Sequence, residues 1–195
     1  MEKQSLFVGT GNPKKLQEMK AILGDGFDVK SFNDLPAPLE VEETEPTLEG
    51  NARLKAMSYH AHTGLPCLAD DTGLEVEALG GAPGVYSARY AGPGNDPEAN
   101  IAKLLAALQG VSNRQAQFRT VISWHDGKEL RYFEGILKGT IALEKRGHKN
   151  FGYDPIFIPE GDSRTLAEMA PEEKNAISHR GLAVRKFAAY LNRKP

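Results

Sequence analysis

The feature that most restricts the fold is an apolar strand that passes into an amphipathic helix near the N-terminus. Residues 6–8 form an apolar run typical of a buried strand, and apolar residues recur at helical spacing over residues 16–23. Between them, Asn12 suits a helix N-cap and Pro13 suits the first helical position. A strand–turn–helix unit of this kind indicates an α/β protein, in which helices cover a sheet.

The order of the later elements extends this prediction. Thr47 can cap a helix that runs to about residue 62, and residues 65–69 indicate a short apolar strand. Residues 118–124 and 130–137 flank an Asp-Gly turn and predict an antiparallel hairpin. Helix-and-strand units around a central hairpin indicate a mixed-sheet α/β fold. For a chain of 195 residues, we expect one domain that spans residues 1–195.

Composition limits the location and the partners. Cys67 is the only cysteine, so an internal disulfide is impossible and a reducing cytoplasm is the expected location. The N-terminus has no signal-peptide pattern, and no apolar stretch approaches the ~18–20 residues needed to span a membrane. The net charge of −2 argues against nucleic-acid binding. Any anionic ligand must therefore be held by a local group of cations.

Lys14 and Lys15 stand in the first turn of the predicted helix, where acidic residues are normally favoured. Cations become favourable there when an anion binds, because exposed backbone N–H groups, the helix dipole and the ammonium groups act together. The alternative is that both lysines are solvated surface residues. The segment that carries them, Thr10-Gly11-Asn12-Pro13-Lys14-Lys15, is therefore a candidate phosphate-binding loop.

A second helix start near the C-terminus has the same unusual charge. Ser178 can cap the last helix, which places His179 and Arg180 in its first turn, and Lys174 lies shortly before them. Residues that break a local rule without structural gain are expected at functional sites. A structural role for His179 remains the alternative.

Asp70 and Asp71 supply the opposite charge at the expected end of the apolar strand. Adjacent carboxylates are costly unless they are exposed or neutralised by a cation. Mg²⁺ is commonly held by one or two carboxylates together with substrate oxygens, so this pair predicts a magnesium site. Glu42 or Glu43 could complete the site, and the alternatives are a capped turn and a solvated acidic loop.

The segment Phe151-Gly152-Tyr153-Asp154 places two aromatic residues around a glycine. Aromatic faces near cations suit stacking on a nucleobase. The alternative is that these aromatic side chains belong to the core.

Taken together, these segments resemble the Ham1/RdgB-like family of non-canonical purine nucleoside triphosphate pyrophosphatases, also called inosine triphosphate pyrophosphatases. The resemblance covers nearly the whole chain in family order and is carried by TGNPKK (10–15), EET and TLEGNARLKA (42–56), LADDTGL (68–74), LGGAPGVYSARYAG (79–92), FGYDPIF (151–157) and EKNAISHRG (173–181). It implies Mg²⁺-dependent hydrolysis of ITP, dITP or XTP to the monophosphate and pyrophosphate. It also implies an elongated, two-lobed, mixed α/β fold of the Maf/Ham1 type, with the active site in a cleft between lobes, and a homodimer.

The resemblance also implies roles for individual residues. Asp71 matches the general base and metal ligand, and Glu42 or Glu43 matches the metal-binding glutamate. Lys15 matches the triphosphate lysine and Lys55 a second one, while the remaining substrate-binding positions are Thr10 to Lys14, Thr72, Phe151, Gly152, Tyr153, Asp154, Lys174, His179 and Arg180. Gly50 departs from the glutamate that many relatives carry, so no metal role is assigned to it.

Three other functions are compatible with parts of this pattern. A regulatory module that binds a triphosphate without cleaving it would use the same lysines and aromatic residues, but it would not favour Asp70 and Asp71 near phosphate. A Maf-type enzyme acting on modified pyrimidines is disfavoured by the family context of His179 and Arg180. RNA binding is disfavoured by the acidic balance of charge.

Overall fold

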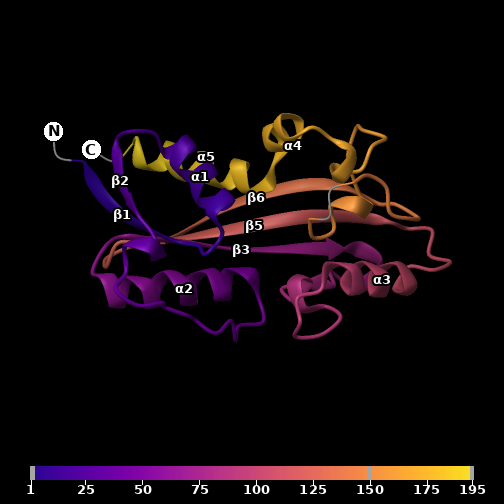
Figure 1. Ribbon diagram of the computed structural model, residues 1–195, viewed down its shortest axis with the longest axis horizontal. Coiled ribbons are helices and arrows are strands. Elements are labelled where there is room, and N and C mark those ends of the chain that lie inside the picture. Colours follow the sequence, from indigo (N-terminus) through magenta and orange to yellow (C-terminus); the bar gives the residue numbers. More distant parts are fainter. Residues whose placement is uncertain (1–2, 149–150, 194–195) are drawn as a thin grey trace. The chain divides into compact units, whose positions relative to one another are not determined.

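The structure is a computed structural model that describes residues 3–148 and 151–193 (Figure 1). Its strands are β1 (Gln4–Gly9), β2 (Phe27–Lys30), β3 (Cys67–Val76), β4 (Pro83–Gly84), β5 (Gln115–His125), β6 (Leu130–Ile141) and β7 (Phe157–Pro159). Its helices are α1 (Pro13–Leu23), α2 (Leu48–Thr63), α3 (Pro97–Ala107), α4 (Pro171–Ile177) and α5 (His179–Leu191). Within the described residues, no helix is long and apolar enough to cross a membrane.

The strands of the described chain form a mixed sheet in the order β2-β1-β3-β5-β6-β7, and β4 pairs with β3. Strand β1 pairs in the parallel sense with β2 and with β3, whereas β4 pairs with β3, and β7 with β6, in the antiparallel sense. Register is set by apolar residues, for example Leu6 opposite Val29 and Val8 opposite Leu68. The predicted mixed-sheet α/β class is confirmed, and a cleft between two lobes stays a prediction.

The chain divides into two compact units. The first consists of Met1–Asp71, Thr120–Gly135 and Arg180–Pro195, and the second of Thr72–Arg119 and Ile136–His179, apart from the residues that the structure does not describe. Strands β3, β5 and β6 contribute residues to both units. The single domain over residues 1–195 stays a prediction.

In the first unit, helices cover both faces of the strands, with α1 and α5 on one face and α2 on the other (Figure 1). Side chains alternate between the faces, as strand geometry requires. Leu6 and Leu68 join the apolar cluster formed with α1 and α5, whereas Phe7, Cys67 and Ala69 join the cluster formed with α2. This alternation decides which helix each functional side chain of β3 meets.

In the second unit, α3 and α4 lie on opposite sides of the strands (Figure 1). The apolar core of this unit includes Leu104 of α3, Phe118 of β5 and Phe157 of β7. Asp96 caps α3 by accepting hydrogen bonds from the backbone N–H groups of residues 98 and 99.

One expectation about the sheet is wrong. The apolar strand was expected to cover residues 65–69 and to end before the two aspartates, but β3 continues without a break from Cys67 to Val76. The two aspartates do not end the strand because each lies beside a cation from a neighbouring helix. Their charge is neutralised in place, so the ladder of backbone hydrogen bonds can continue through them.

Candidate active site

The start of α1 forms the predicted turn. The side-chain oxygen of Asn12 accepts hydrogen bonds from the backbone N–H groups of Lys14 and Lys15 at 3.0 and 3.4 Å. The Thr10 hydroxyl accepts a hydrogen bond from the N–H of Asn12 at 3.2 Å, and Pro13 occupies the first helical position. The first turn contains no acidic residue. The predicted strand–turn–helix unit is confirmed, and its first turn carries two lysines without an acidic residue in the same turn.

Asp70 is a buried carboxylate that lies close to cationic side chains of α1 and α5. Its Oδ2 lies 3.2 Å from Lys15 Nζ and 3.9 Å from Arg180 Nε. Burial alone raises the pKa of Asp70, but the positive charges of Lys15, Arg180 and Lys55 outweigh it and bring the pKa to about 2. Asp70 is therefore ionised at neutral pH and holds two cations on one face of the sheet.

A second carboxylate, that of Glu18 on α1, also binds Arg180. Arg180 Nη1 donates a hydrogen bond to Glu18 Oε2 at 3.4 Å. Glu18 lies one helical turn after Lys14 and Lys15, so the same helix that presents cations at its start also fixes this arginine. Glu18 and Asp70 together restrict the position of the guanidinium group.

Asp71 lies on the opposite face of β3, toward α2. Its Oδ1 is 3.9 Å from Lys55 Nζ, and the same ammonium group donates a hydrogen bond to Glu43 Oε1 at 2.7 Å. Burial raises the pKa of Asp71 to about 6; Lys55 and a hydrogen bond to Asn51 oppose the shift, whereas the carboxylates of Glu43 and Asp70 add to it. A carboxyl group with a pKa close to neutrality suits proton transfer.

Asn51 ties the acidic loop to α2. Its side chain is fully buried, accepts a hydrogen bond from the backbone N–H of Glu45 at 2.9 Å and donates one to the Glu45 carbonyl at 3.3 Å. The loop passes close to the helix because residue 50 is glycine. A Cβ at Gly50 would lie 2.7 Å from the Cβ of Glu45 and 3.0 Å from the Thr47 hydroxyl. A residue with a side chain would therefore not fit at position 50 unless the loop moved.

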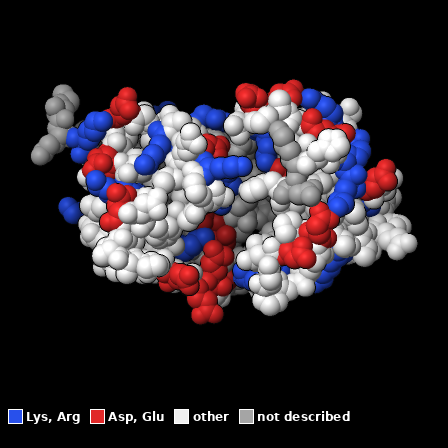
Figure 2. Space-filling model, in the orientation of Figure 1, with Lys and Arg blue, Asp and Glu red and all other residues white. Residues whose placement is uncertain are grey.

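The acidic loop before α2 provides the oxygen atoms that a metal ion would need. Figure 2 shows acidic side chains gathered where this loop lies. Glu43 is half-buried and contacts Lys55, whereas Glu42 is exposed. No group of three or more metal-ligating side chains occurs among the residues that the structure describes. The carboxylates of Glu43 and Asp71, both beside Lys55, match a Mg²⁺ site completed by substrate oxygens.

The second unit contains the predicted aromatic and basic residues. Lys174 of α4 forms an ion pair with the buried carboxylate of Asp154, and its Nζ lies 4.9 Å from the centroid of the Phe151 ring. Phe151 is 53% exposed, whereas Tyr153 is buried and donates a hydrogen bond from its hydroxyl to the Ser87 carbonyl at 2.6 Å. The two aromatic residues therefore differ: Phe151 offers an accessible ring face, and Tyr153 belongs to the core.

Three further predicted residues belong to the second unit. His179 is the first residue of α5, as predicted, and it is half-buried. Gly152 adopts a positive φ of 52°, which favours glycine at this turn. Thr72 follows Asp71 on β3 and is half-buried.

Comparisons with known proteins agree with this arrangement. The sequence profile of the Ham1 family matches residues 6–190. The chain belongs to the Ham1 family. A relative from Porphyromonas gingivalis named dITP/XTP pyrophosphatase is 51% identical, with 96% of this chain and 97% of the relative covered. One from Bacillus subtilis with the same name is 45% identical, with 94% and 95% covered. A solved Ham1 protein from Coxiella burnetii is 40% identical, has a TM-score of 0.92 and covers 98% of this chain and 100% of its own.

Several of the predicted site residues of this Ham1 protein contact one another within each unit. Within the first unit, the start of α1 and Arg180 meet at Asp70, and Lys55 and Glu43 meet at Asp71. Within the second unit, Lys174 contacts both Phe151 and Asp154. The catalytic, substrate-binding and metal-binding roles of these residues stay predictions.

Sequence reasoning missed Glu18 and Asn51 in this Ham1 protein. Both could have been found from helical spacing, because Glu18 lies three residues after Lys15 and Asn51 lies four residues before Lys55. Burial of Asn51 could not be seen in the sequence. A polar residue that is fully buried and bonded to a functional loop is apparent only in the folded chain.

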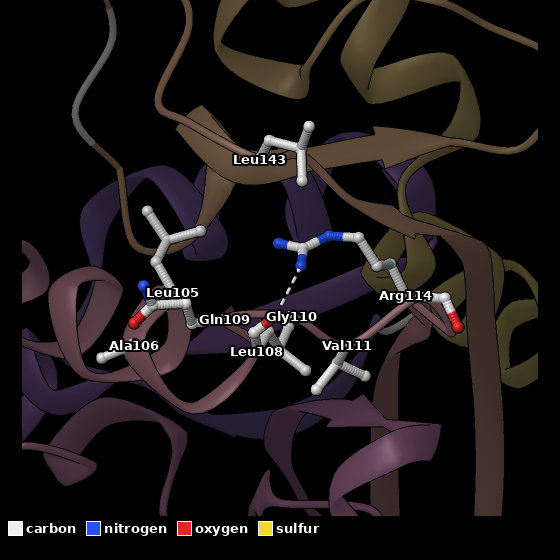
Figure 3. Close-up of a pocket in the computed structure, with 9 residues that line it drawn as sticks. Leu105, Ala106, Leu108, Gln109, Gly110, Val111, Arg114 and Leu143 are labelled. Carbon is white, nitrogen blue, oxygen red and sulfur yellow. Dashed lines mark hydrogen bonds between the residues drawn. The ribbon is translucent and has the colours of Figure 1, made fainter.

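A hollow of about 510 Å³ also lies in the second unit, lined by residues that include Leu105, Val111 and Leu143 (Figure 3). Arg114 lies beside it, but its guanidinium group donates to the carbonyls of Leu108, Ile141 and Ala142. We interpret Arg114 as a structural clamp, because three of its N–H groups are already used by the backbone.

Proposed function

We propose that this Ham1 protein is a Mg²⁺-dependent nucleoside triphosphate pyrophosphatase. It would hydrolyse ITP, dITP and XTP to the monophosphate and pyrophosphate and so remove non-canonical purine nucleotides from the nucleotide pool. The relatives named dITP/XTP pyrophosphatase support this proposal. The observation that carries it is the placement of Asp71, with its raised pKa, beside Lys55 and Glu43.

The triphosphate would bind through the start of α1 and the nearby lysines. Backbone N–H groups of a helix start and the helix dipole favour an anion there. Thr10 to Pro13 shape the turn, Lys14 is exposed, and Lys15 is half-buried beside Asp70. Lys55 provides a further ammonium group on the Asp71 side of β3. The proposal assigns binding of the departing pyrophosphate to the helix start, Lys15 and Lys55.

Asp71 would act as the general base. With a pKa of about 6, its carboxylate is mostly ionised at neutral pH and can take a proton from the water that attacks the α-phosphorus. The bond from the α-phosphorus to the bridging oxygen then breaks, and pyrophosphate leaves. Glu43 and Asp71 would hold Mg²⁺, which neutralises charge on phosphate oxygens when it is bound.

Recognition of the base is assigned to Phe151, Lys174, His179 and Arg180. Phe151 presents a ring face for stacking, and Arg180 carries only hydrogen-bond donors. Hypoxanthine and xanthine have a carbonyl oxygen at position 6, which accepts such donors, whereas adenine has an amino group there. A site built on these hydrogen bonds can reject the wrong base by up to ~10⁴-fold.

The proposal includes a homodimer that acts in the cytoplasm, as expected for a Ham1 protein with a single cysteine. Sedimentation velocity on the purified protein tests the dimer. A species of one chain at micromolar concentration would contradict it.

A panel of triphosphates tests the activity. ITP, dITP, XTP, GTP and ATP are each incubated with the protein and Mg²⁺, and pyrophosphate and free phosphate are measured separately. We expect pyrophosphate from ITP, dITP and XTP, little product from ATP, and no product in EDTA. Tight binding of ITP without turnover would instead indicate a regulatory module. Equal kcat/KM for ITP and ATP would overturn the assignment of the base-binding residues.

A further inference from the structure

Phe118 presents the face of its ring to a residue that the proposed function assigns to base recognition. Phe118 lies on β5, and its ring centroid is 5.1 Å from that of His179, with 19° between the ring planes. Phe118 is only 8% exposed and belongs to the apolar core of the second unit. His179 is half-buried at the first position of α5. A core ring thus supports a ring at a helix start.

Phe118 also contacts a second aromatic ring, in the core of the second unit. Its ring lies 4.6 Å from the ring of Phe157, which is fully buried at the start of β7. The three rings of Phe157, Phe118 and His179 form a continuous series that begins in the core and ends at α5. Close-packed interiors hold buried rings in defined rotamers. The face that Phe118 offers to His179 is therefore fixed by the core rather than by His179.

The orientation of an imidazole ring decides what it can bind. Its ring nitrogens donate or accept in the ring plane, so a hydrogen bond to a planar base requires that plane to be set correctly. A histidine at a helix start has rotamer freedom, and ordering it during binding weakens affinity. A stacked neighbour removes that freedom before substrate arrives, because stacking involves the face of the imidazole ring and not its edge.

We infer that Phe118 is a positioning residue for base recognition: its ring sets the plane of the His179 imidazole so that the ring edge faces the purine carbonyl. The inference rests on the proposed function, since it requires His179 to bind the base. It assigns to Phe118 a role that acts only through His179. Phe118 touches neither phosphate nor water in this role, so it affects substrate affinity and leaves the chemical step unchanged.

The first test is the effect of Phe118→Leu on ITP hydrolysis. We expect KM for ITP to rise about fivefold, the size of effect that one aromatic stack contributes, while kcat changes less than twofold. Phe118→Tyr retains the ring and should restore KM to within about twofold of the unmodified protein. If Phe118→Leu does not fold, Phe118→Met, which keeps the side-chain volume, replaces it. An unchanged KM in the folded ring-less variant overturns the inference.

A double-mutant cycle separates positioning from packing. In a His179→Ala background, removal of the Phe118 ring should produce no further rise in KM, because the residue it positions is absent. Phe133→Leu is the matched control, since Phe133 packs on Phe187 and Tyr190 in the first unit. It should lower Tm without raising KM. An equal rise in KM in the His179→Ala background, or in the control, contradicts the inference.

Failure of the proposed function gives a different result. In that case the unmodified protein releases no pyrophosphate from ITP. If the unmodified protein is active but KM does not change when the Phe118 ring is removed, only the positioning role is rejected.

Discussion

Asp70 and Asp71 are neighbours on β3, yet they bind cations from helices on opposite faces of the sheet. Asp70 Oδ2 lies 3.2 Å from Lys15 Nζ on the side of α1 and α5, and Asp71 Oδ1 lies 3.9 Å from Lys55 Nζ on the side of α2. The surroundings move their pKa values apart, to about 2 and about 6. Two adjacent carboxyl groups therefore have different properties: Asp70 is a permanent anion that anchors cations, and Asp71 can exchange a proton near neutral pH.

Asp71→Asn should abolish turnover while the protein stays folded. We expect kcat for ITP to fall by about 10³-fold or more, since the general base is lost. The raised pKa means that Asp71 favours the folded state below about pH 3.8 and loses this contribution as pH rises through about 6. At pH 8 in EDTA, Asp71→Asn should therefore be more stable than the unmodified protein, by up to about 3 kcal/mol.

Urea unfolding at pH 5 and pH 8 measures this difference, and the advantage of Asp71→Asn should be larger at pH 8. Near-normal turnover by this variant would exclude Asp71 as the base.

Asp70→Asn should destabilise the protein, because Lys15 and Arg180 would lose a shared buried partner. We expect a loss of about 3 kcal/mol at pH 7. The lowered pKa means that the contribution of Asp70 is present above about pH 3.8 and is lost as pH falls through about 2. The difference in unfolding free energy between the two proteins should therefore shrink below pH 4.

Asp28→Asn is the control for Asp70→Asn, since Asp28 pairs with Lys30 at the surface. It should change stability little, because exposed ion pairs contribute little. Equal effects of the two substitutions would show that Asp70 does not anchor cations.

Asn51→Ala should weaken the link between the acidic loop and α2. We expect a loss of about 2 kcal/mol, because the partly buried backbone N–H and carbonyl groups of Glu45 lose their partner. Because the same loop carries Glu43, the Mg²⁺ concentration for half-maximal activity should rise. Asn100→Ala is a matched control: Asn100 is also buried and bonds the backbone of Ala88 and Ala91 in the second unit. It should lower Tm similarly and leave the Mg²⁺ dependence unchanged.

Gly50→Ala should destabilise α2 even though alanine favours helices. Helix propensity favours alanine by about 1 kcal/mol, but the added Cβ would lie 2.7 Å from the Cβ of Glu45. We expect the steric clash to outweigh the helix propensity, so that the free energy of unfolding, measured by thermal unfolding, falls by about 1–2 kcal/mol. Gly181→Ala on α5 is the control, because its Cβ would meet only the ends of two long side chains, Arg185 at 3.1 Å and Glu18 at 3.5 Å. A stabilised Gly50→Ala would show that the loop can move away from the helix.

Local structure was largely predictable because its signals lie within short stretches of sequence. The caps by Asn12 and Thr47 and the proline at the start of α1 were each predicted from residue type and position, and each has the expected geometry. The start of α5 at His179 was predicted in the same way. These features depend on hydrogen bonds between residues close in the chain.

The different surroundings and pKa values of Asp70 and Asp71 were not predictable in this way. Because the strand was expected to end before the aspartates, we did not predict that they alternate and point to opposite faces of the sheet. Which cation each meets depends on helices that begin far away in sequence, α1 and α5 for one and α2 for the other. The same is true of the stack of Phe118 on His179.

The sequence by itself determined the order of elements, the family and the set of candidate residues, because periodicity, caps and motifs are local properties of the chain. Only the tertiary structure decided which of those residues touch, how deeply they are buried and hence which carboxyl group has a pKa raised toward neutral pH. The physical reason is that burial and charge–charge interactions depend on distances between residues that the chain brings together only on folding.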